Sequence, residues 1–116
     1  MSAITTHVLD TALGRPAPGV PVRLTRIAPD HAANQAPNQT VAEANTDDDG
    51  RVSELGPDQA EPGTYQLRFD VAAYCAATGQ DCFFPEVTVT FTVTDARHHH
   101  VPLLLSPFAY STYRGS

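Results

Sequence analysis

Hydrophobic and polar residues alternate along several short stretches of the chain, which is the pattern of β-strands with one buried face. The alternation is clearest over 86–94, where three valines and Phe91 share one face and four threonines share the other. A second strong strand is predicted over 64–71, after Pro62-Gly63, which marks its start. The side chains of this strand expected to point inwards are Tyr65, Leu67, Phe69 and Val71.

Weaker forms of the same pattern predict further strands before and after these two. They cover 5–9, 20–27, 41–45, 51–52, 98–106 and 108–113. The alanine-rich stretch 71–78 ends before Gly79, which predicts a short helix with a glycine stop, and no other helix is indicated. The stretch from Pro29 to Gln39 is rich in Ala, Asn, Gln and Pro and is interpreted as a surface loop.

Eight short strands with turns between them indicate an all-β fold, a two-sheet β-sandwich of seven to eight strands with one short helix. The chain has 116 residues, a length typical of one domain, so residues 1–116 are expected to form a single domain. The last strand of such a sandwich would leave an unpaired edge, and pairing with another subunit would protect it.

Composition and charge narrow the range of partners. The formal net charge of −6 disfavours binding to nucleic acid, and a small anionic substrate would need a local cluster of arginine and histidine. No apolar run approaches the length of about 20 residues that crosses a bilayer, and no signal peptide is visible, so we expect no membrane contact and a cytoplasmic location. In that compartment Cys75 and Cys82 are expected to be reduced, although a bridge between them is geometrically conceivable.

The run Arg97-His98-His99-His100 is the first candidate for chemistry. Strand periodicity places His98 and His100 on one face and His99 on the other. Two neighbouring imidazoles can take a proton from water and return it to a leaving nitrogen. The same spacing also suits a solvent-exposed cluster without function, or two ligands of a zinc site whose third ligand would come from His7, His31 or a carboxylate.

Two further residues have ordinary structural interpretations when taken alone. Arg51 follows the acidic run Asp47-Asp48-Asp49 and would by default form a weak surface ion pair with Asp48 or Asp49. His7 lies in a half-apolar strand on the face opposite Val8, where a lone histidine is usually a packed or surface residue. The aspartate run lacks the ligand spacing of a calcium loop and is interpreted as a solvated turn.

Several motifs, in the right order from end to end, make the chain resemble the transthyretin-related 5-hydroxyisourate hydrolases. The strongest matches are HHHVPLLLSP at 98–107 and YSTYRGS at 110–116, whose final Tyr-Arg-Gly-Ser distinguishes these enzymes from transthyretin itself. Supporting matches are THVLD at 6–10, DGR at 49–51, AAY at 72–74 and FPEV at 84–87.

This chain departs from the family pattern at three positions. His99 replaces the usual tyrosine, and Cys75 and Cys82 stand where aromatic or small polar residues are more familiar. Because His99 is expected to face away from the site, its replacement should alter packing rather than activity.

The resemblance implies a transthyretin-like sandwich that assembles as a homotetramer, a dimer of dimers, with active sites between the dimers. It also implies a small anionic purine-derived substrate, 5-hydroxyisourate, whose ring amide is hydrolysed to 2-oxo-4-hydroxy-4-carboxy-5-ureidoimidazoline in urate degradation. The implied catalytic residues are His7, Arg51, His100 and Ser116, and the implied substrate-binding residues are His98, Tyr113 and Arg114.

The hypothesis for the reaction is that His100, helped by His7 and Ser116, activates water while Arg51 stabilises negative charge. His98 would orient the ring or tune His100, and Tyr113 and Arg114 would shape the pocket mouth. The scheme requires no metal and no organic cofactor. Two alternatives are a transthyretin-like carrier of a hydrophobic ligand and a metal-binding protein that uses the histidine cluster.

Overall fold

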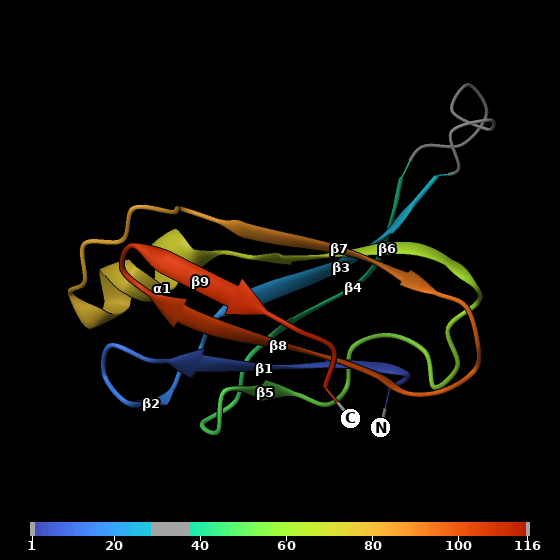
Figure 1. Cartoon of the computed structure of the whole chain (residues 1–116), viewed down its shortest axis with the longest axis horizontal. Helices are drawn as coiled ribbons and strands as arrows, with labels where there is room; N and C mark the ends of the chain where they lie inside the picture. The colour runs from blue at the N-terminus through green and yellow to red at the C-terminus, as the bar shows by residue number, and fades with distance from the viewer. Residues whose placement is uncertain (1, 29–37, 116) are drawn as a thin grey trace.

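The computed structural model describes residues 2–28 and 38–115, and across them nine strands and one helix form two sheets (Figure 1). The elements are β1 (Ile4–Asp10), β2 (Arg15–Pro16), β3 (Pro21–Ile27), β4 (Gln39–Asn45), β5 (Arg51–Val52), β6 (Gly63–Phe69), α1 (Val71–Thr78), β7 (Val87–Val93), β8 (His99–Ser106) and β9 (Ala109–Thr112). The one strand that the pattern did not predict is β2, two residues long. Gln39, placed in a loop by sequence, begins β4, and residues 29–37 of that predicted loop lie outside the described part.

The two sheets have different roles in placing the candidate site. One has the order β2-β1-β8-β9, with the short β5 also pairing with β1, and the other has the order β4-β3-β6-β7. The pair β1–β8 is parallel, and it joins a strand near the start of the chain to one near its end. Figure 1 shows α1 at one end of the sandwich.

The alternation seen in sequence matches the burial in the structure. Tyr65, Leu67 and Phe69 of β6 are buried between the sheets, as are Val87 and Val93 at the two ends of β7. The intervening Val89 and Phe91 are half-buried and pack against this core. The threonines of β7 face solvent, so the strand has one buried and one exposed face as predicted.

The helix spans Val71–Thr78 as predicted, whereas the preceding strand, predicted over 64–71, already ends at Phe69. Val71 is buried, as expected, but it opens α1 instead of closing β6. The reason is local: the carboxylate of Asp70 accepts a hydrogen bond from the backbone N–H of Ala73 at 3.1 Å and caps the helix. Gly79 ends the helix in the left-handed conformation, with φ of 69°.

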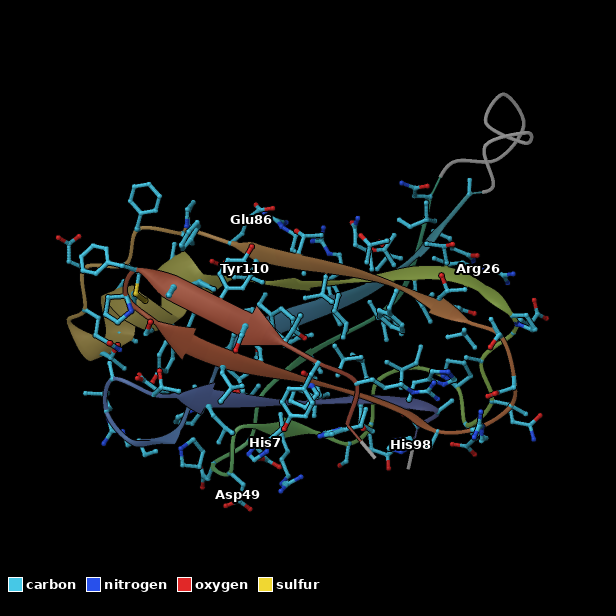
Figure 2. The ribbon with its side chains drawn as sticks, in the orientation of Figure 1. His7, Arg26, Asp49, Glu86, His98 and Tyr110 are labelled. Carbon is cyan, nitrogen blue, oxygen red and sulfur yellow. A yellow bond between two sulfur atoms is a disulfide. The ribbon has the colours of Figure 1, made fainter. Side chains whose placement is uncertain are left out.

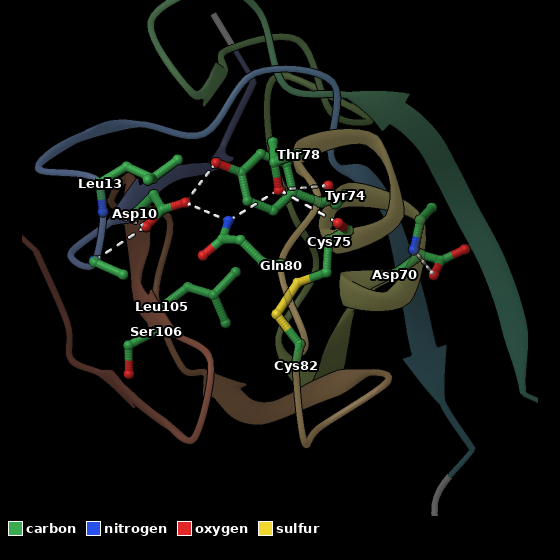
Figure 3. Close-up of a disulfide and its surroundings, with 12 residues drawn as sticks. Asp10, Leu13, Asp70, Tyr74, Cys75, Thr78, Gln80, Cys82, Leu105 and Ser106 are labelled. Carbon is green, nitrogen blue, oxygen red and sulfur yellow. Dashed lines mark hydrogen bonds between the residues drawn. A yellow bond between two sulfur atoms is a disulfide. The ribbon is translucent and has the colours of Figure 1, made fainter.

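Cys75 and Cys82 form a disulfide, which corrects the expectation that both thiols are reduced (Figure 3). Gly79 turns the chain back after α1, and the backbone N–H of Gln80 donates to the carbonyl of Cys75 at 3.0 Å. This turn brings the two Cα atoms to 6.2 Å, within the range that a disulfide spans. The bridge ties α1 to the loop that leads into β7.

A buried carboxylate joins the end of β1 to α1. The hydroxyl of Tyr74 donates to Asp10 at 2.6 Å, and Gln80 and two backbone N–H groups also donate to it. Burial opposes ionisation of Asp10, but donation from Tyr74 and the other donors outweighs it and lowers the pKa of Asp10. Burial also raises the pKa of Tyr74, and the hydrogen bond to Asp10 adds to that rise. The pair is therefore a charged hydrogen bond that anchors β1.

Candidate active site

Three strands of one sheet bring the candidate side chains to a common face. Across the β1–β5 pair His7 lies opposite Arg51, and across the β1–β8 pair Thr5 lies opposite His100. Because alternate residues of a strand share a face, these four side chains leave the sheet on the same side, and His98 joins them two residues before His100. Of these five side chains, all except His7 border a pocket of about 200 Å³. Its lining comprises Thr5, Thr6, Arg51, Val52, Ser53, His98 and His100.

Figure 2 shows how this face lies relative to the rest of the molecule. The labelled His7 and His98 lie along the side formed by β1, β5 and β8, whereas Arg26 and Glu86 lie on the side of the other sheet. Those two belong to exposed ion pairs, Arg26 with Glu61 and Arg68 with Glu86. The histidines and the exposed ion pairs of the other sheet therefore occupy different surfaces.

The imidazoles of His98 and His100 lie side by side over one hydroxyl group. Their ring centroids are 6.3 Å apart and the ring planes differ by 25°. The Oγ1 atom of Thr5 is 2.9 Å from Nε2 of His98 and 2.8 Å from Nδ1 of His100. His99 points the other way and is 4% exposed, so the alternation predicted for the three histidines is observed.

His7 is oriented by the acidic turn that precedes β5. Its Nε2 atom is 2.8 Å from the carbonyl oxygen of Asp49. A carbonyl oxygen can only accept, so Nε2 of His7 carries the hydrogen and Nδ1 of the neutral ring is left as the acceptor. The turn is exposed, as predicted, and one carboxylate oxygen of Asp47 accepts from the backbone N–H groups of Asp49 and Arg51.

The electrostatic surroundings favour a neutral His100. Burial lowers its pKa below the ordinary value of 6.5, and the nearby His98, Arg51 and His7 lower it further. Within residues 2–28 and 38–115, Arg51 does not form the surface ion pair that the sequence predicted. The arginines that form salt bridges in this part of the chain are Arg23, Arg26, Arg68 and Arg97. A neutral imidazole and an arginine beside the same pocket can accept a proton from water and attract an anion, respectively.

The C-terminal tail reaches this site through Gly115. Its backbone N–H donates to the carbonyl of His100 at 2.8 Å, and an added Cβ would lie 2.6 Å from Cδ2 of the His100 ring. Ser116 lies outside the described residues. Tyr113 and Arg114 line a separate depression of about 130 Å³ beside His99, so the single chain does not bring them to the His98–His100 pocket.

Sequence reasoning missed two residues that contact His100, namely Thr5 and Gly115. Thr5 becomes visible only once β1 and β8 are known to be parallel neighbours, and a strand pattern contains no such information. Gly115 lies within the terminal motif, but its contact with His100 depends on the path of the tail.

Within residues 2–28 and 38–115, no three His, Cys, Asp or Glu side chains are grouped as a metal ion would require. No helix there is long and apolar enough to cross a membrane.

Comparison with known proteins assigns this chain to one family. The model of the HIUase/Transthyretin family matches residues 4–115. The 5-hydroxyisourate hydrolase of Mus musculus is 48% identical over 120 residues, which cover 99% of this chain and 96% of that protein. The structure of Klebsiella pneumoniae 5-hydroxyisourate hydrolase has 33% identity and a TM-score of 0.83, over 97% of this chain and 98% of that one. Sea bream transthyretin in complex with thyroxine has 28% identity and a TM-score of 0.86, over 97% and 94% of the two chains. The chain therefore belongs to the HIUase/Transthyretin family.

Proposed function

We propose that this protein hydrolyses 5-hydroxyisourate to 2-oxo-4-hydroxy-4-carboxy-5-ureidoimidazoline, a step of urate degradation. The observation that carries the proposal is the convergence of His7, Arg51 and the His98–His100 pair on one sheet face. The names of the relatives support it, since a curated 5-hydroxyisourate hydrolase is 48% identical over nearly the whole chain.

The proposed reaction begins with water held beside His100. The Nδ1 atom of His100 contacts Thr5, so the Nε2 atom is the one available to take a proton from water. His7 can hold the same water through its Nδ1 atom, because its Nε2–H is occupied by the carbonyl of Asp49. The hydroxide attacks a ring carbonyl carbon, the C–N bond of the ring breaks, and the protonated His100 returns the proton to the leaving nitrogen.

Arg51 supplies the positive charge that the substrate requires. The protein has a net charge of −6, so an anion binds only where a local cation overcomes the general repulsion. The guanidinium can hold the anionic ring and stabilise the charge that develops on the attacked carbonyl oxygen. Neither a metal nor an organic cofactor takes part in this scheme.

Assembly would complete the site. We propose a homotetramer, a dimer of dimers, in which residues 1–116 act as one domain and a neighbouring subunit holds the tail so that Ser116 joins the hydrogen bonds around the water. Tyr113 and Arg114 would then approach the substrate across the interface between subunits. The proposed partners are the small anionic substrate and further copies of the chain, with neither nucleic acid nor membrane, and the proposed location is the cytoplasm.

The test is hydrolysis of 5-hydroxyisourate generated freshly from urate and uricase and followed by its absorbance. The wild-type protein should accelerate the decay, and His100→Asn and Arg51→Ala should each lower turnover by about tenfold or more without changing the oligomer. Arg23→Ala is the matched control, because Arg23 lies on the other sheet in an exposed ion pair with Glu43. Wild-type decay no faster than in buffer would refute the proposal.

Ligand carriage is the competing function, because the thyroxine-bound transthyretin superposes with a TM-score of 0.86, against 0.83 for the hydrolase. Backbone similarity therefore does not separate the two functions, and the side chains of the site must decide. Two histidines and an arginine beside the pocket favour hydrolysis of an anion over storage of an apolar ligand. Tight thyroxine binding without hydrolysis would reverse this choice, and loss of activity after exhaustive chelation would favour a metal-dependent alternative.

A further inference from the structure

Thr5 holds the only side-chain hydroxyl that touches both histidines in the described part of the chain. Its Oγ1 atom lies 2.9 Å from Nε2 of His98 and 2.8 Å from Nδ1 of His100, and no other hydrogen bond of this hydroxyl is recorded within residues 2–28 and 38–115. Thr5 is 5% exposed, so water has little access to compete for the hydroxyl. The parallel pairing of β1 with β8 places Thr5 directly beside His100.

Counting hydrogens restricts the forms that the two rings can take. A hydroxyl has one hydrogen, so it donates to one imidazole nitrogen and accepts from the other. Either His100 donates from Nδ1 while His98 accepts at Nε2, or His98 donates from Nε2 while His100 accepts at Nδ1. In the first arrangement Nε2 of neutral His100 has a free lone pair. In the second, that same atom carries a hydrogen and cannot take a proton from water.

We propose that Thr5 is a positioning residue that holds both histidines in the Nδ1–H tautomer, with Nδ1–H of His100 donating to Thr5 and Thr5 donating to Nε2 of His98. This inference rests on the proposed hydrolase function, which needs the lone pair of His100 Nε2. The remaining nitrogen of His98, Nδ1, then carries its hydrogen, and water can solvate that N–H because His98 is exposed.

The same arrangement suits the protonated state of the base. When His100 takes a proton at Nε2, its Nδ1–H still donates to Thr5 and Thr5 still donates to neutral His98, so no hydrogen bond is broken. The Nδ1–H···Oγ1 bond becomes stronger once the ring is cationic. Thr5 therefore stabilises the imidazolium without any movement of the chain, and it also disfavours a second proton on His98, since the Nε2 atom of that ring is occupied as an acceptor.

The test compares three variants at one strand. Thr5→Val keeps the shape and the β-branch of the side chain but removes the hydroxyl, whereas Thr5→Ser keeps the hydroxyl. Thr11→Val is the control, because Thr11 follows β1 directly and donates its hydroxyl to the carbonyl of Leu105 in β8, away from both histidines. The first readout is the tautomer of each ring from long-range proton–nitrogen NMR of protein labelled at histidine, recorded at alkaline pH. The second readout is kcat and KM for 5-hydroxyisourate.

In the wild type we expect His100 with its hydrogen on Nδ1 and His98 with its hydrogen on Nδ1 as well, which leaves His98 Nε2 facing Thr5 as the acceptor. Thr5→Val should release both rings to mixed tautomers and lower kcat by about tenfold or more, with a smaller change in KM. Thr5→Ser should keep the wild-type tautomers and kcat within about threefold, and Thr11→Val should match the wild type.

Wild-type His100 with its hydrogen on Nε2 overturns the proposal without any variant, and so does an unchanged kcat in Thr5→Val. A purely structural role for Thr5 would lower stability but leave the tautomers in place, which also overturns it. Failure of the hydrolase function is a separate result: the wild-type protein would then show no hydrolysis, while the NMR tautomers would still report whether Thr5 orders the two rings.

Discussion

His7 lies directly opposite Arg51 in the antiparallel pairing of β1 with β5. Because β5 has only two residues, its own ladder cannot fix the position of Arg51. The preceding turn supplies the rest: the carbonyl of Gly50 accepts from the backbone N–H of Val8 at 2.7 Å, and one oxygen of Asp47 accepts from the N–H groups of Asp49 and Arg51. The relative placement of His7 and Arg51 therefore depends on the turn that precedes β5.

The first prediction concerns this turn. Asp47→Ala removes the acceptor of two backbone N–H groups and should cost about 1 kcal/mol of stability. It should also lower kcat/KM by about tenfold, because Arg51 and the carbonyl that orients His7 both lose their support. Asp48→Ala, in the same exposed turn, is the matched control and should retain activity. Steady-state kinetics and thermal unfolding of both variants decide, and equal activities would show that the turn does not position Arg51.

The second prediction concerns the contact between the tail and His100. Gly115→Ala would place a Cβ 2.6 Å from Cδ2 of the His100 ring, so either the ring or the tail must move. We expect a loss of turnover of about tenfold with little change in Tm, because the residues around the tail are mostly exposed. Gly14→Ala is the control: its Cβ meets nothing within 4 Å and adds only backbone strain of about 1 kcal/mol. Wild-type turnover in Gly115→Ala would contradict the prediction.

The third prediction concerns pH. The pKa of His100 is lowered below 6.5 by burial and by His98, Arg51 and His7, so the neutral base should persist as the pH falls below that value. The acid limb of kcat/KM should therefore lie below pH 6.5, and His98→Asn should move it upwards, because one of the groups that depress the pKa is removed. An acid limb at or above pH 6.5 in the wild type would argue against His100 as the base.

The lowered pKa of His100 also makes the stability of the fold depend on pH. Since the folded pKa is below the unfolded value, the unfolded chain binds more protons in the window just under pH 6.5. The contribution of His100 to stability is thus present above that window and is lost as the pH falls through it.

The fourth prediction concerns the Cys75–Cys82 disulfide. The bridge closes a loop with a sequence separation of 7, and restriction of the unfolded chain by a loop of this size is worth about 2–3 kcal/mol. Reductant should therefore lower the Tm of the wild type by about 10 °C and leave turnover unchanged, because α1 lies at one end of the sandwich. The double variant Cys75→Ala with Cys82→Ala should have the lower Tm with or without reductant. A wild-type Tm that is insensitive to reductant, in protein shown to be reduced, would contradict the estimate.

Much of the fold could be predicted because short stretches of sequence determine which side chains are buried and where a helix begins and ends. The period-two pattern identified the inward side chains of β6 and β7, and it separated His99 from His98 and His100. Alanine content and Gly79 located α1. In each case the information lies within about ten residues, which is the range over which periodicity and capping act.

What could not be predicted depends on groups far apart in the chain. Periodicity assigns a side chain to a face but not to a neighbour, so the pairing of Thr5 with His100 was invisible. The disulfide was missed for a related reason. Reduced cysteines were expected because a cytoplasmic location was inferred, whereas the geometry of the turn at Gly79 determines whether the two sulfurs can meet. Sequence suggested Tyr113 and Arg114 near His98, but in the single chain they lie beside His99.

The parallel pairing of β1 with β8 also constrains how the protein is made. Thr5 and His100 are 95 positions apart in the sequence. Most of the chain must therefore be synthesised before β1 and β8 can pair. During synthesis β1 has no β8 partner, and its apolar side chains depend on transient contacts or on chaperones. Catalytic competence should therefore appear abruptly, only after the last strand has emerged, with no partly active product before it.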